Sequence, residues 1–290
     1  MKNIYQKKHV LITGGSSGIG LAVAKGAARL GANISIISRR LDVLEQAQLE
    51  ILEQRSEETF VNIISADVSN EEEIAEALHT LVFDRELPDI VINCAGVTHP
   101  GEFYKLSTDI FRWNMEINYY GTVYVLKALV PGMIRRGSGR IVNISSGVGI
   151  MNIYGYTAYG ASKFAVNGLT EALRMELKPH GIQVSLVIPA DTNTPQLAYE
   201  DRYKPAVTRE LNKVGGLMEP EAVAEELLAG VSRGRYLILP GSDIKFLYAL
   251  LRIFGRSLFY RYLDAIVSKT LKTVPPGEDD FGGQYQSGPD

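Results

Sequence analysis

The sequence predicts an α/β protein whose core is a parallel, doubly wound sheet of seven strands with helices on both faces. Short apolar runs alternate with longer helix-like stretches from the beginning of the chain. Most runs have five or six residues and lack the apolar–polar alternation of a half-exposed strand, which indicates burial on both faces. A glycine-rich segment, Thr13–Gly20, follows the first run and favours a tight turn from strand to helix.

The expected elements follow one another in a regular order. The predicted strands are His9–Thr13, Asn33–Ser38, Phe60–Ser65, Asp89–Asn93, Arg140–Ser145, Gln183–Ile188 and Tyr236–Leu239. The predicted helices are Ile19–Leu30, Leu41–Glu57, 71–84, 109–136, 157–178 and 219–230. This strand–helix–strand alternation is typical of a Rossmann fold.

The composition of the chain changes near residue 240. Residues 1–240 hold the alternating pattern and are expected to form one Rossmann domain. Residues 241–274 are rich in aromatic and basic side chains and are expected to form a helical extension. Residues 275–290 are rich in Pro, Gly and Asp, a composition typical of a disordered tail.

Charge and cysteine content exclude several classes of protein. The net charge of −3 predicts no nucleic-acid partner, and a single cysteine, Cys94, rules out an internal disulfide framework. The four histidines show no ligand spacing, so no metal site is expected. No apolar leader and no stretch of 18 uncharged apolar residues is visible. These features predict a cytoplasmic protein, either free or at the cytoplasmic face of a membrane.

The Thr13–Gly20 segment has the chemistry of a phosphate-binding turn. Its glycines allow a close backbone approach, and the following helix offers free N–H groups and the positive end of its dipole. Two serine hydroxyls add hydrogen-bond donors. The alternative, a glycine-rich loop without a ligand, is disfavoured by the position between the first strand and the first helix. The predicted cofactor contacts here are Gly14, Ser16, Ser17, Gly18, Ile19 and Gly20.

The end of the second strand indicates which nicotinamide cofactor is bound. An NAD site usually has a carboxylate there to bind the ribose 2′-hydroxyl. This chain instead reads Ser38-Arg39-Arg40, and Arg39 can bind a 2′-phosphate. We therefore predict NADPH/NADP+ as the cofactor. The alternative is that both arginines are solvated charges at a strand end.

A tyrosine and a lysine four residues apart are the candidate catalytic pair. Tyr159 and Lys163 share one face of a predicted helix, so both side chains can point into one cleft. The chain has 15 tyrosines, and Tyr159 alone has a lysine at this spacing. A nearby ammonium favours the phenolate and lowers the pKa of a tyrosine, which suits general acid–base work.

The Thr-Gly-x-x-x-Gly-x-Gly turn and the Tyr-x-x-x-Lys pair together resemble the short-chain dehydrogenase/reductase family, from about Lys8 to Leu239. The resemblance implies that Ser146, 13 positions before Tyr159, binds the substrate carbonyl, with Ser145 as the alternative. It also implies that Asn118 helps to hold a water beside the lysine. The alternative for this asparagine is a helix kink or a packing amide.

The same resemblance implies further cofactor contacts at Asp67, Val68, Asn93, Gly96, Pro189, Thr192 and Thr194. Asp67 and Val68 would contact the adenine, and Lys163 would also bind the nicotinamide ribose. Cys94, beside Asn93, is interpreted as a packing residue rather than a nucleophile. The segment near 195–217 corresponds to the substrate lid of the family, and Gln196–Leu217 is predicted to be helical.

Segments around the catalytic pair resemble one group within that family, the 3-ketodihydrosphingosine reductases. They are Thr157–Ala165, Glu171–Pro179 and above all Pro189–Pro195. This resemblance implies NADPH-dependent reduction of a small lipid ketone, 3-dehydrosphinganine, to sphinganine. Val43 departs from the pattern because a second basic residue is expected there. The alternatives are a 3-oxoacyl-carrier-protein reductase, a hydroxysteroid- or retinol-type dehydrogenase, and a non-catalytic NADPH-sensing protein.

The basic and aromatic extension has two interpretations. Lys245, Arg252 and Arg256 would fall on one helical face, with Phe246, Leu247, Leu250, Leu251 and Phe254 on other faces. Such helices can lie at an anionic membrane surface, which predicts peripheral membrane contact through 244–272. Alternatively they cap the hydrophobic pocket or pack in an oligomer. A homo-oligomer, a dimer or a tetramer, is expected.

Overall fold

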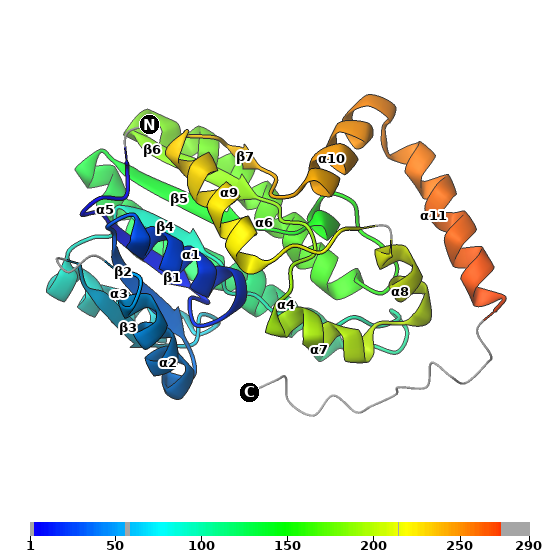
Figure 1. Cartoon of the computed structure of the whole chain (residues 1–290), viewed down its shortest axis with the longest axis horizontal. Coiled ribbons are helices and arrows are strands. Elements are labelled where there is room, and N and C mark those ends of the chain that lie inside the picture. Colours follow the sequence, from blue (N-terminus) through cyan, green and yellow to red (C-terminus); the bar gives the residue numbers. More distant parts are fainter. Residues whose placement is uncertain (1–2, 56–58, 214, 274–290) are drawn as a thin grey trace.

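The computed structural model describes residues 3–55, 59–213 and 215–273. Its centre is a parallel seven-stranded sheet in the order β3-β2-β1-β4-β5-β6-β7 (Figure 1). The strands are β1 (His9–Thr13), β2 (Asn33–Ser38), β3 (Val61–Ser65), β4 (Ile90–Asn93), β5 (Gly139–Ile144), β6 (Ile182–Val187) and β7 (Leu237–Ile238). The predicted fold class is therefore confirmed.

Helices connect the strands and extend the chain beyond them. They are α1 (Gly18–Arg29), α2 (Leu41–Leu52), α3 (Glu71–Arg85), α4 (Thr108–Met115), α5 (Gly121–Arg136), α6 (Thr157–Leu177), α7 (Pro195–Tyr203), α8 (Ala206–Asn212), α9 (Pro220–Ser232), α10 (Ser242–Phe254) and α11 (Arg256–Leu271). A π-helical turn, η1 (Glu116–Tyr120), joins α4 to α5, and short 3-10 turns, η2 (Gly147–Gly149) and η3 (Lys178–His180), flank α6.

Several boundaries differ from the sequence prediction. The helix expected over Gln196–Leu217 is two helices, α7 and α8, separated at Lys204–Pro205, and α8 ends at Asn212. Two other helices also differ. The helix expected over Leu41–Glu57 ends at Leu52, and residues 56–58 lie outside the described part of the chain. The helix expected over 109–136 is interrupted by the π-helical turn at Glu116–Tyr120. A π turn inserts one extra residue into a helix, which amphipathic periodicity alone does not reveal.

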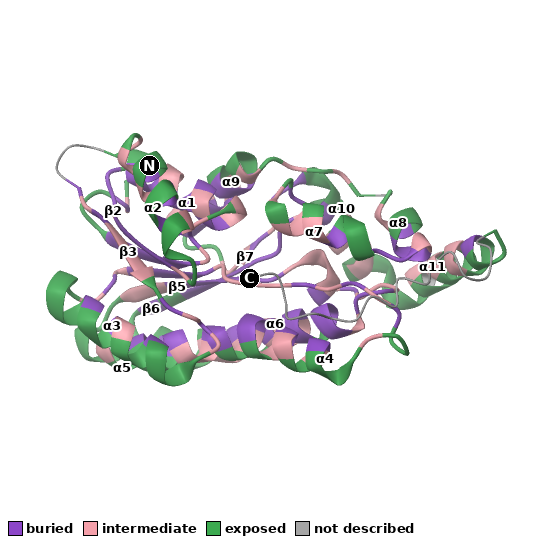
Figure 2. Cartoon of the chain, turned by 90° about the horizontal axis from the view of Figure 1, so that it is seen from below, coloured by how far each residue is buried: buried purple, intermediate pink, exposed green. Residues whose placement is uncertain are grey.

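The sheet is covered on both faces because neighbouring residues of its strands point in opposite directions. In β1, Val10 and Ile12 pack with α1, α2 and α9, whereas Leu11 packs with α3 and α5. Figure 2 shows these two helical layers above and below the sheet. Burial on both faces explains why the strands read as continuous apolar runs.

The order of the strands places a crevice at one edge of the sheet. β1 pairs with β2 on one side and with β4 on the other, so the connections after β1 and β4 leave in opposite directions. In open parallel sheets, ligands bind outside the carboxyl ends of the strands at this point. The turn after Thr13 and the loop after Asn93 therefore lie side by side, and Thr13 Oγ1 accepts hydrogen bonds from the Cys94 and Ala95 amides.

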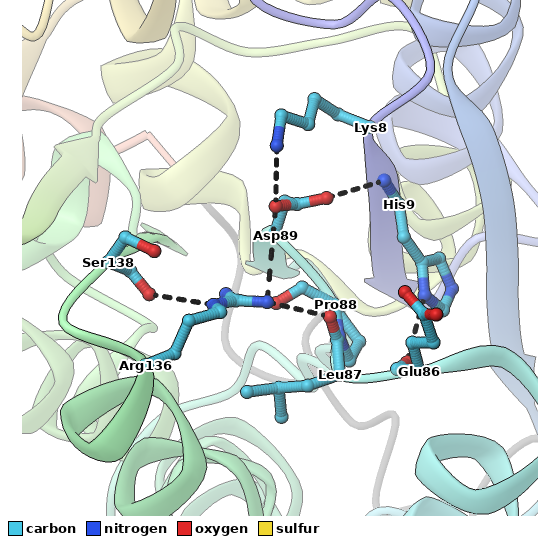
Figure 3. A network of polar contacts seen from close by, with 8 residues as sticks. All are labelled: Lys8, His9, Glu86, Leu87, Pro88, Asp89, Arg136 and Ser138. Atoms are coloured by element: carbon cyan, nitrogen blue, oxygen red, sulfur yellow. Dashed lines mark hydrogen bonds and ion pairs between the residues drawn. The ribbon is translucent and has the colours of Figure 1, made fainter.

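The amino ends of the strands are joined by a polar network around Asp89 (Figure 3). Its Oδ2 atom accepts a hydrogen bond from the His9 amide, and its Oδ1 atom pairs with Lys8 Nζ at 3.0 Å. The Arg136 guanidinium donates to the carbonyl oxygens of Leu87 and Pro88. These bonds connect β1, β4 and the end of α5 at the edge opposite the crevice.

The extension consists of two helices and not one. Gly255 has φ 70° and ψ 178°, a left-handed backbone that ends α10 and lets α11 begin in a new direction (Figure 1). Arg256 therefore does not share a helical face with Lys245 and Arg252, which corrects the sequence-based expectation. The predicted disordered tail, 275–290, lies outside the described residues. Within the described ranges, no helix is both long and apolar enough to cross a membrane.

Candidate active site

The turn between β1 and α1 has the geometry expected of a phosphate-binding turn. Gly14 and Gly18 have φ angles of 66° and 51°, which disfavour any other residue. A Cβ atom on Gly20 would lie 2.2 Å from the Gly14 carbonyl oxygen, so the turn closes only because that side chain is absent. The Ser16 hydroxyl donates a 3.0 Å hydrogen bond to Ser38 Oγ and ties the turn to the end of β2.

An elongated cleft of about 370 Å³ runs from this turn along the carboxyl ends of the strands. Most of the residues predicted to contact the cofactor line it. They are Gly14, Ser16, Ser17, Gly18, Ile19, Gly20, Arg39, Asp67, Val68, Gly96, Tyr159, Lys163, Pro189, Thr192 and Thr194. The cleft thus brings together segments that are 180 residues apart in the sequence, from Gly14 to Thr194.

One end of the cleft carries positive charge and the other carries the candidate catalytic pair. Arg39 and Arg40 follow β2, are exposed and line the cleft. Asp67 follows β3, and its Oδ1 atom accepts hydrogen bonds from the Ser69 amide and hydroxyl, which orients the carboxylate. The phosphate-binding turn also meets the segment after β6, because a Cβ atom on Gly18 would lie 3.0 Å from Thr194 Cγ2.

Tyr159 and Lys163 lie on α6 and are both buried. The Lys163 Nζ atom lies 5.7 Å from the centroid of the Tyr159 ring and donates a 3.1 Å hydrogen bond to the Ile144 carbonyl oxygen at the end of β5. Gly96 leaves room for this ammonium, because a Cβ atom there would lie 3.3 Å from Nζ. The lysine is thus held by the end of the sheet.

The electrostatics of this pair differ from the simple expectation that the lysine lowers the pKa of the tyrosine. Burial raises the pKa of the Tyr159 phenol, and the negative charge of Glu200 raises it further. Hydrogen bonds with Ser146 and Gln196 act in the opposite direction on this pKa. Burial lowers the pKa of Lys163 to about 8. In this state the phenol is protonated near neutral pH, as a proton donor must be.

Three predicted site residues do not line the cleft. Asn118 lies in the π-helical turn and is buried; its Oδ1 atom accepts from the Val97 amide, and its Nδ2 atom donates to the Val97 carbonyl and to Ser162 Oγ. It therefore holds the loop after β4 against α6. Asn93 is buried and donates to Asn143 Oδ1 across the sheet.

The third is Ser146, which is half-buried and interacts with the Tyr159 hydroxyl instead of forming the cleft wall. Its neighbour Ser145 is buried, lines the cleft and donates a long 3.4 Å hydrogen bond to the Lys163 carbonyl oxygen. The direct interaction with the phenol favours Ser146 over Ser145 as the partner of Tyr159. Both serines lie between β5 and η2, at the same end of the sheet as Ile144.

Sequence reasoning missed a group of polar side chains on α7 and before α6. Gln196 and Glu200 line the cleft, and Glu200 is buried. Tyr156 OH donates a 2.6 Å hydrogen bond to Glu200 Oε2, and the Tyr156 and Tyr159 rings lie 5.9 Å apart. The Pro195 start and the Thr194 cap signalled the helix, but no sequence spacing signalled that Glu200 faces inward.

No group of three or more potential metal ligands is present among the described residues. The cleft brings together Tyr159, Lys163 and the phosphate-binding turn, and Ser146 interacts with the phenol. These features fit a dinucleotide-binding oxidoreductase, because the turn accepts a pyrophosphate at a helix N-terminus and the phenol lies at the opposite part of the same cleft.

Comparison with known proteins identifies the family. The family model for short chain dehydrogenases matches residues 8–204. The 3-ketodihydrosphingosine reductase of Mus musculus is 39% identical over 237 residues, which cover 81% of this chain and 71% of the mouse protein. The enzyme of the same name from Dictyostelium discoideum is 34% identical over 282 residues, which cover 92% of this chain and 84% of that protein.

The solved structures agree with the sequence relatives. A short-chain dehydrogenase from Sphingobium yanoikuyae in complex with NADPH matches with a TM-score of 0.71 and 25% identity, over 93% of this chain and 98% of that one. The chain belongs to the short-chain dehydrogenase family of oxidoreductases. Its predicted family membership is confirmed.

Proposed function

We propose that the protein reduces the ketone of 3-dehydrosphinganine to the alcohol of sphinganine with NADPH. The observation that carries the proposal is the arrangement of Tyr159 and Lys163 in a cleft that also contains a phosphate-binding turn. The relatives from mouse and Dictyostelium support the substrate, because both are named 3-ketodihydrosphingosine reductase. Their similarity extends over most of this chain.

The residues of the cleft fit a nicotinamide dinucleotide. Gly14, Gly18 and Gly20 allow the tight turn at the N-terminus of α1, where a pyrophosphate would bind. Asp67 and Val68 would contact the adenine, while Pro189 and Thr194 would contact the nicotinamide half. When bound, the reduced cofactor supplies the hydride that reaches the carbonyl carbon of the ketone.

The side chains of the chain itself supply the proton and the orientation. Ser146 donates a hydrogen bond to the carbonyl oxygen of the substrate and stabilises the charge that develops there. Tyr159 delivers its proton to the same oxygen. Lys163 contacts the nicotinamide ribose and provides a positive charge near the phenol, and Asn118 holds the Val97 loop in place beside them.

Arg39 supports the preference for NADPH over NADH. Its guanidinium lies at the end of β2, on the cleft, where an NAD site has a carboxylate. A 2′-phosphate there would gain charge-assisted hydrogen bonds, and no acidic side chain occupies the Ser38–Arg40 segment to repel it.

The substrate lid is proposed to be α7 and α8. α7 contributes Gln196 and Glu200 to the cleft, and α8 packs against α11 of the extension. α10 lies beside η2, which follows Ser146, because a Cβ atom on Gly147 would lie 3.3 Å from Ile244 Cδ1. The extension therefore borders the region in which a long alkyl chain would lie, as a pocket cap requires.

Peripheral membrane contact is proposed through α10. Phe246, Ile253 and Phe254 are exposed, and their spacing of seven and eight residues places them on one side of the helix. Two of the three predicted cations have partners on the body of the protein: Lys245 pairs with Glu226 Oε2 at 2.6 Å, and Arg256 lies over the Phe164 ring. The apolar stripe, rather than the cations, supports the contact.

The membrane proposal is tested by vesicle co-sedimentation of the full chain and of the double variant Phe246→Ser/Ile253→Ser. Binding of the parent chain to phosphatidylcholine vesicles with loss of binding in the variant is the expected result. Equal binding of both proteins would contradict a role for α10.

A homo-oligomer, predicted as a dimer or a tetramer, is proposed as well. Sedimentation velocity of the same samples checks it.

The reaction is tested with the purified chain and three ketones, each with NADPH and with NADH. The ketones are 3-dehydrosphinganine, a 3-oxoacyl thioester and a steroid ketone. The expected result is the highest kcat/KM for 3-dehydrosphinganine with NADPH. A higher kcat/KM for the thioester or the steroid would contradict the proposed substrate.

A further inference from the structure

Glu200 is a buried carboxylate in the wall of the cleft that the reduction mechanism does not use. It lies on α7 and is 8% exposed. Its Oε2 atom accepts a 2.6 Å hydrogen bond from Tyr156 OH, and its Oε1 atom accepts a 3.3 Å hydrogen bond from Gln196 Nε2. Both donors are neutral, so these bonds orient the carboxylate without cancelling its charge.

The nearest cation has a closer partner elsewhere. Lys204 Nζ lies 3.8 Å from Glu200 Oε2 but 2.8 Å from Asp201 Oδ1. Lys204 lowers the pKa of Glu200, but burial raises it more, so this ion pair does not fully offset the removal of the carboxylate from water. The cleft thus offers an oriented negative charge that a cationic ligand would stabilise.

Glu200 is also close to the position where the ketone must lie. Gln196 interacts with both the Tyr159 hydroxyl and Glu200, so one side chain separates the phenol from the carboxylate. On the other side, the Tyr156 ring lies 5.9 Å from the Tyr159 ring while its hydroxyl holds Glu200. A positive group on the carbon next to the ketone would therefore face this carboxylate when the carbonyl faces Tyr159.

We propose that Glu200 recognises the ammonium group on the carbon adjacent to the ketone of the substrate, and so selects 2-amino ketones over simple ketones. This inference rests on the proposed function, since 3-dehydrosphinganine has a primary amine at that carbon. Asp191 also lines the cleft and adds to its negative charge. Glu200 is a specificity-determining residue; its charge also raises the pKa of the Tyr159 phenol, an effect that is the same for every ketone.

The test compares two ketones of equal chain length: 3-dehydrosphinganine and 1-hydroxyoctadecan-3-one, which lacks the amine. Both are assayed at saturating NADPH and at a pH that keeps the amine protonated. In Glu200→Gln, kcat/KM for the amino ketone is expected to fall about 10- to 100-fold, the loss typical of one charge-assisted bond. The kcat/KM for the amine-free ketone should change much less, because this ketone senses only the influence of Glu200 on the pKa of Tyr159.

The control is Glu50→Gln, which removes a carboxylate paired with Lys25 at 2.9 Å on α2, away from the cleft. It should leave the ratio of the two kcat/KM values unchanged. If Glu200→Gln does not bind NADPH, Tyr156→Phe removes the 2.6 Å bond that orients Glu200 while keeping the ring, and should lower the ratio in the same direction.

The possible failures are distinct. An equal loss for both ketones in Glu200→Gln, or an unchanged ratio in a variant that binds NADPH normally, would overturn the ammonium role and leave the proposed reaction intact. A parent enzyme that reduces neither ketone but does reduce another class would instead overturn the proposed function, and with it this inference.

Discussion

Lys163 and Tyr159 are neighbours on one face of α6, with Nζ 5.7 Å from the centroid of the phenol ring, yet the lysine donates its 3.1 Å hydrogen bond to Ile144 of the sheet. The positive charge is therefore anchored to β5, which ends just before Ser145 and Ser146. This anchoring holds the ammonium at a fixed distance from the phenol while α6 carries both side chains.

Replacing Tyr159 with Phe removes the proposed proton donor without changing the ring that packs beside Tyr156. Turnover is expected to fall by more than about 1,000-fold, which is at the upper end for loss of a general acid. The Kd for NADPH, measured by the change in nicotinamide fluorescence, should change less than about threefold. A variant with near-normal turnover would refute the assignment of Tyr159.

The pH dependence of the free enzyme should report Lys163. Burial lowers the pKa of this ammonium to about 8, so it is charged below that pH and neutral above it. The kcat/KM for NADPH, which reflects groups of the free enzyme, should therefore fall as the pH rises through about 8. Lys163→Arg keeps its charge and should lose this step even if its rate is lower. A parent profile that stays flat well above this pH would contradict the role of the ammonium.

The preference for NADPH should depend on Arg39. Arg39→Ala removes a cation from the end of β2 and should raise the KM for NADPH about 10- to 100-fold, since one charge-assisted bond is lost. The KM for NADH should change little because NADH has no 2′-phosphate. Arg135→Ala, which removes an exposed arginine from the end of α5, is the matched control. Equal effects of Arg39→Ala on both cofactors would rule out contact with the phosphate.

His9, at the edge of the sheet away from the cleft, should make the free energy of unfolding depend on pH. Burial lowers the pKa of His9 to about 4, from about 6.5 in the unfolded chain. Between these values the unfolded state binds more protons, so the free energy of unfolding decreases as the pH falls from 6.5 to 4. The full contribution of this group is about 3 kcal/mol, at about 1.4 kcal/mol per pKa unit.

Urea denaturation at several pH values checks this expectation. His9→Gln should flatten the decrease, because glutamine does not titrate, whereas His79→Gln replaces an exposed histidine on α3 and should leave the decrease unchanged. The same slope in the parent and in His9→Gln would show that other groups cause the acid sensitivity.

The sheet and the phosphate-binding turn could be predicted because their signals are local. The turn needs glycine at positions 14, 18 and 20, because a side chain there would clash or strain the backbone. The three glycines can be seen in the sequence, so the turn could be predicted from it. The strands read as apolar runs because both faces are buried. The candidate catalytic pair could be predicted because its two members share one helix at a spacing of four residues.

Other features could not be predicted because they depend on contacts between distant segments. Glu200 faces the cleft because Tyr156, 44 residues earlier, donates a hydrogen bond to it. Asn118 was assigned by resemblance to hold a water, and its bonds to Val97 and Ser162 become visible only in the folded chain. The single helical face drawn through Lys245 and Arg256 was wrong because the backbone turns at Gly255, and a lone glycine does not specify that turn.

The packing of α11 on α8 has an evolutionary consequence. The cofactor is expected to contact residues up to Thr194, whereas the helices proposed to border the alkyl chain come from α7 onward. Changes near the end of the gene can therefore alter the range of ketones accepted while the nucleotide platform stays the same. Chimaeras that exchange residues after 240 between relatives are a direct way to transfer chain-length preference.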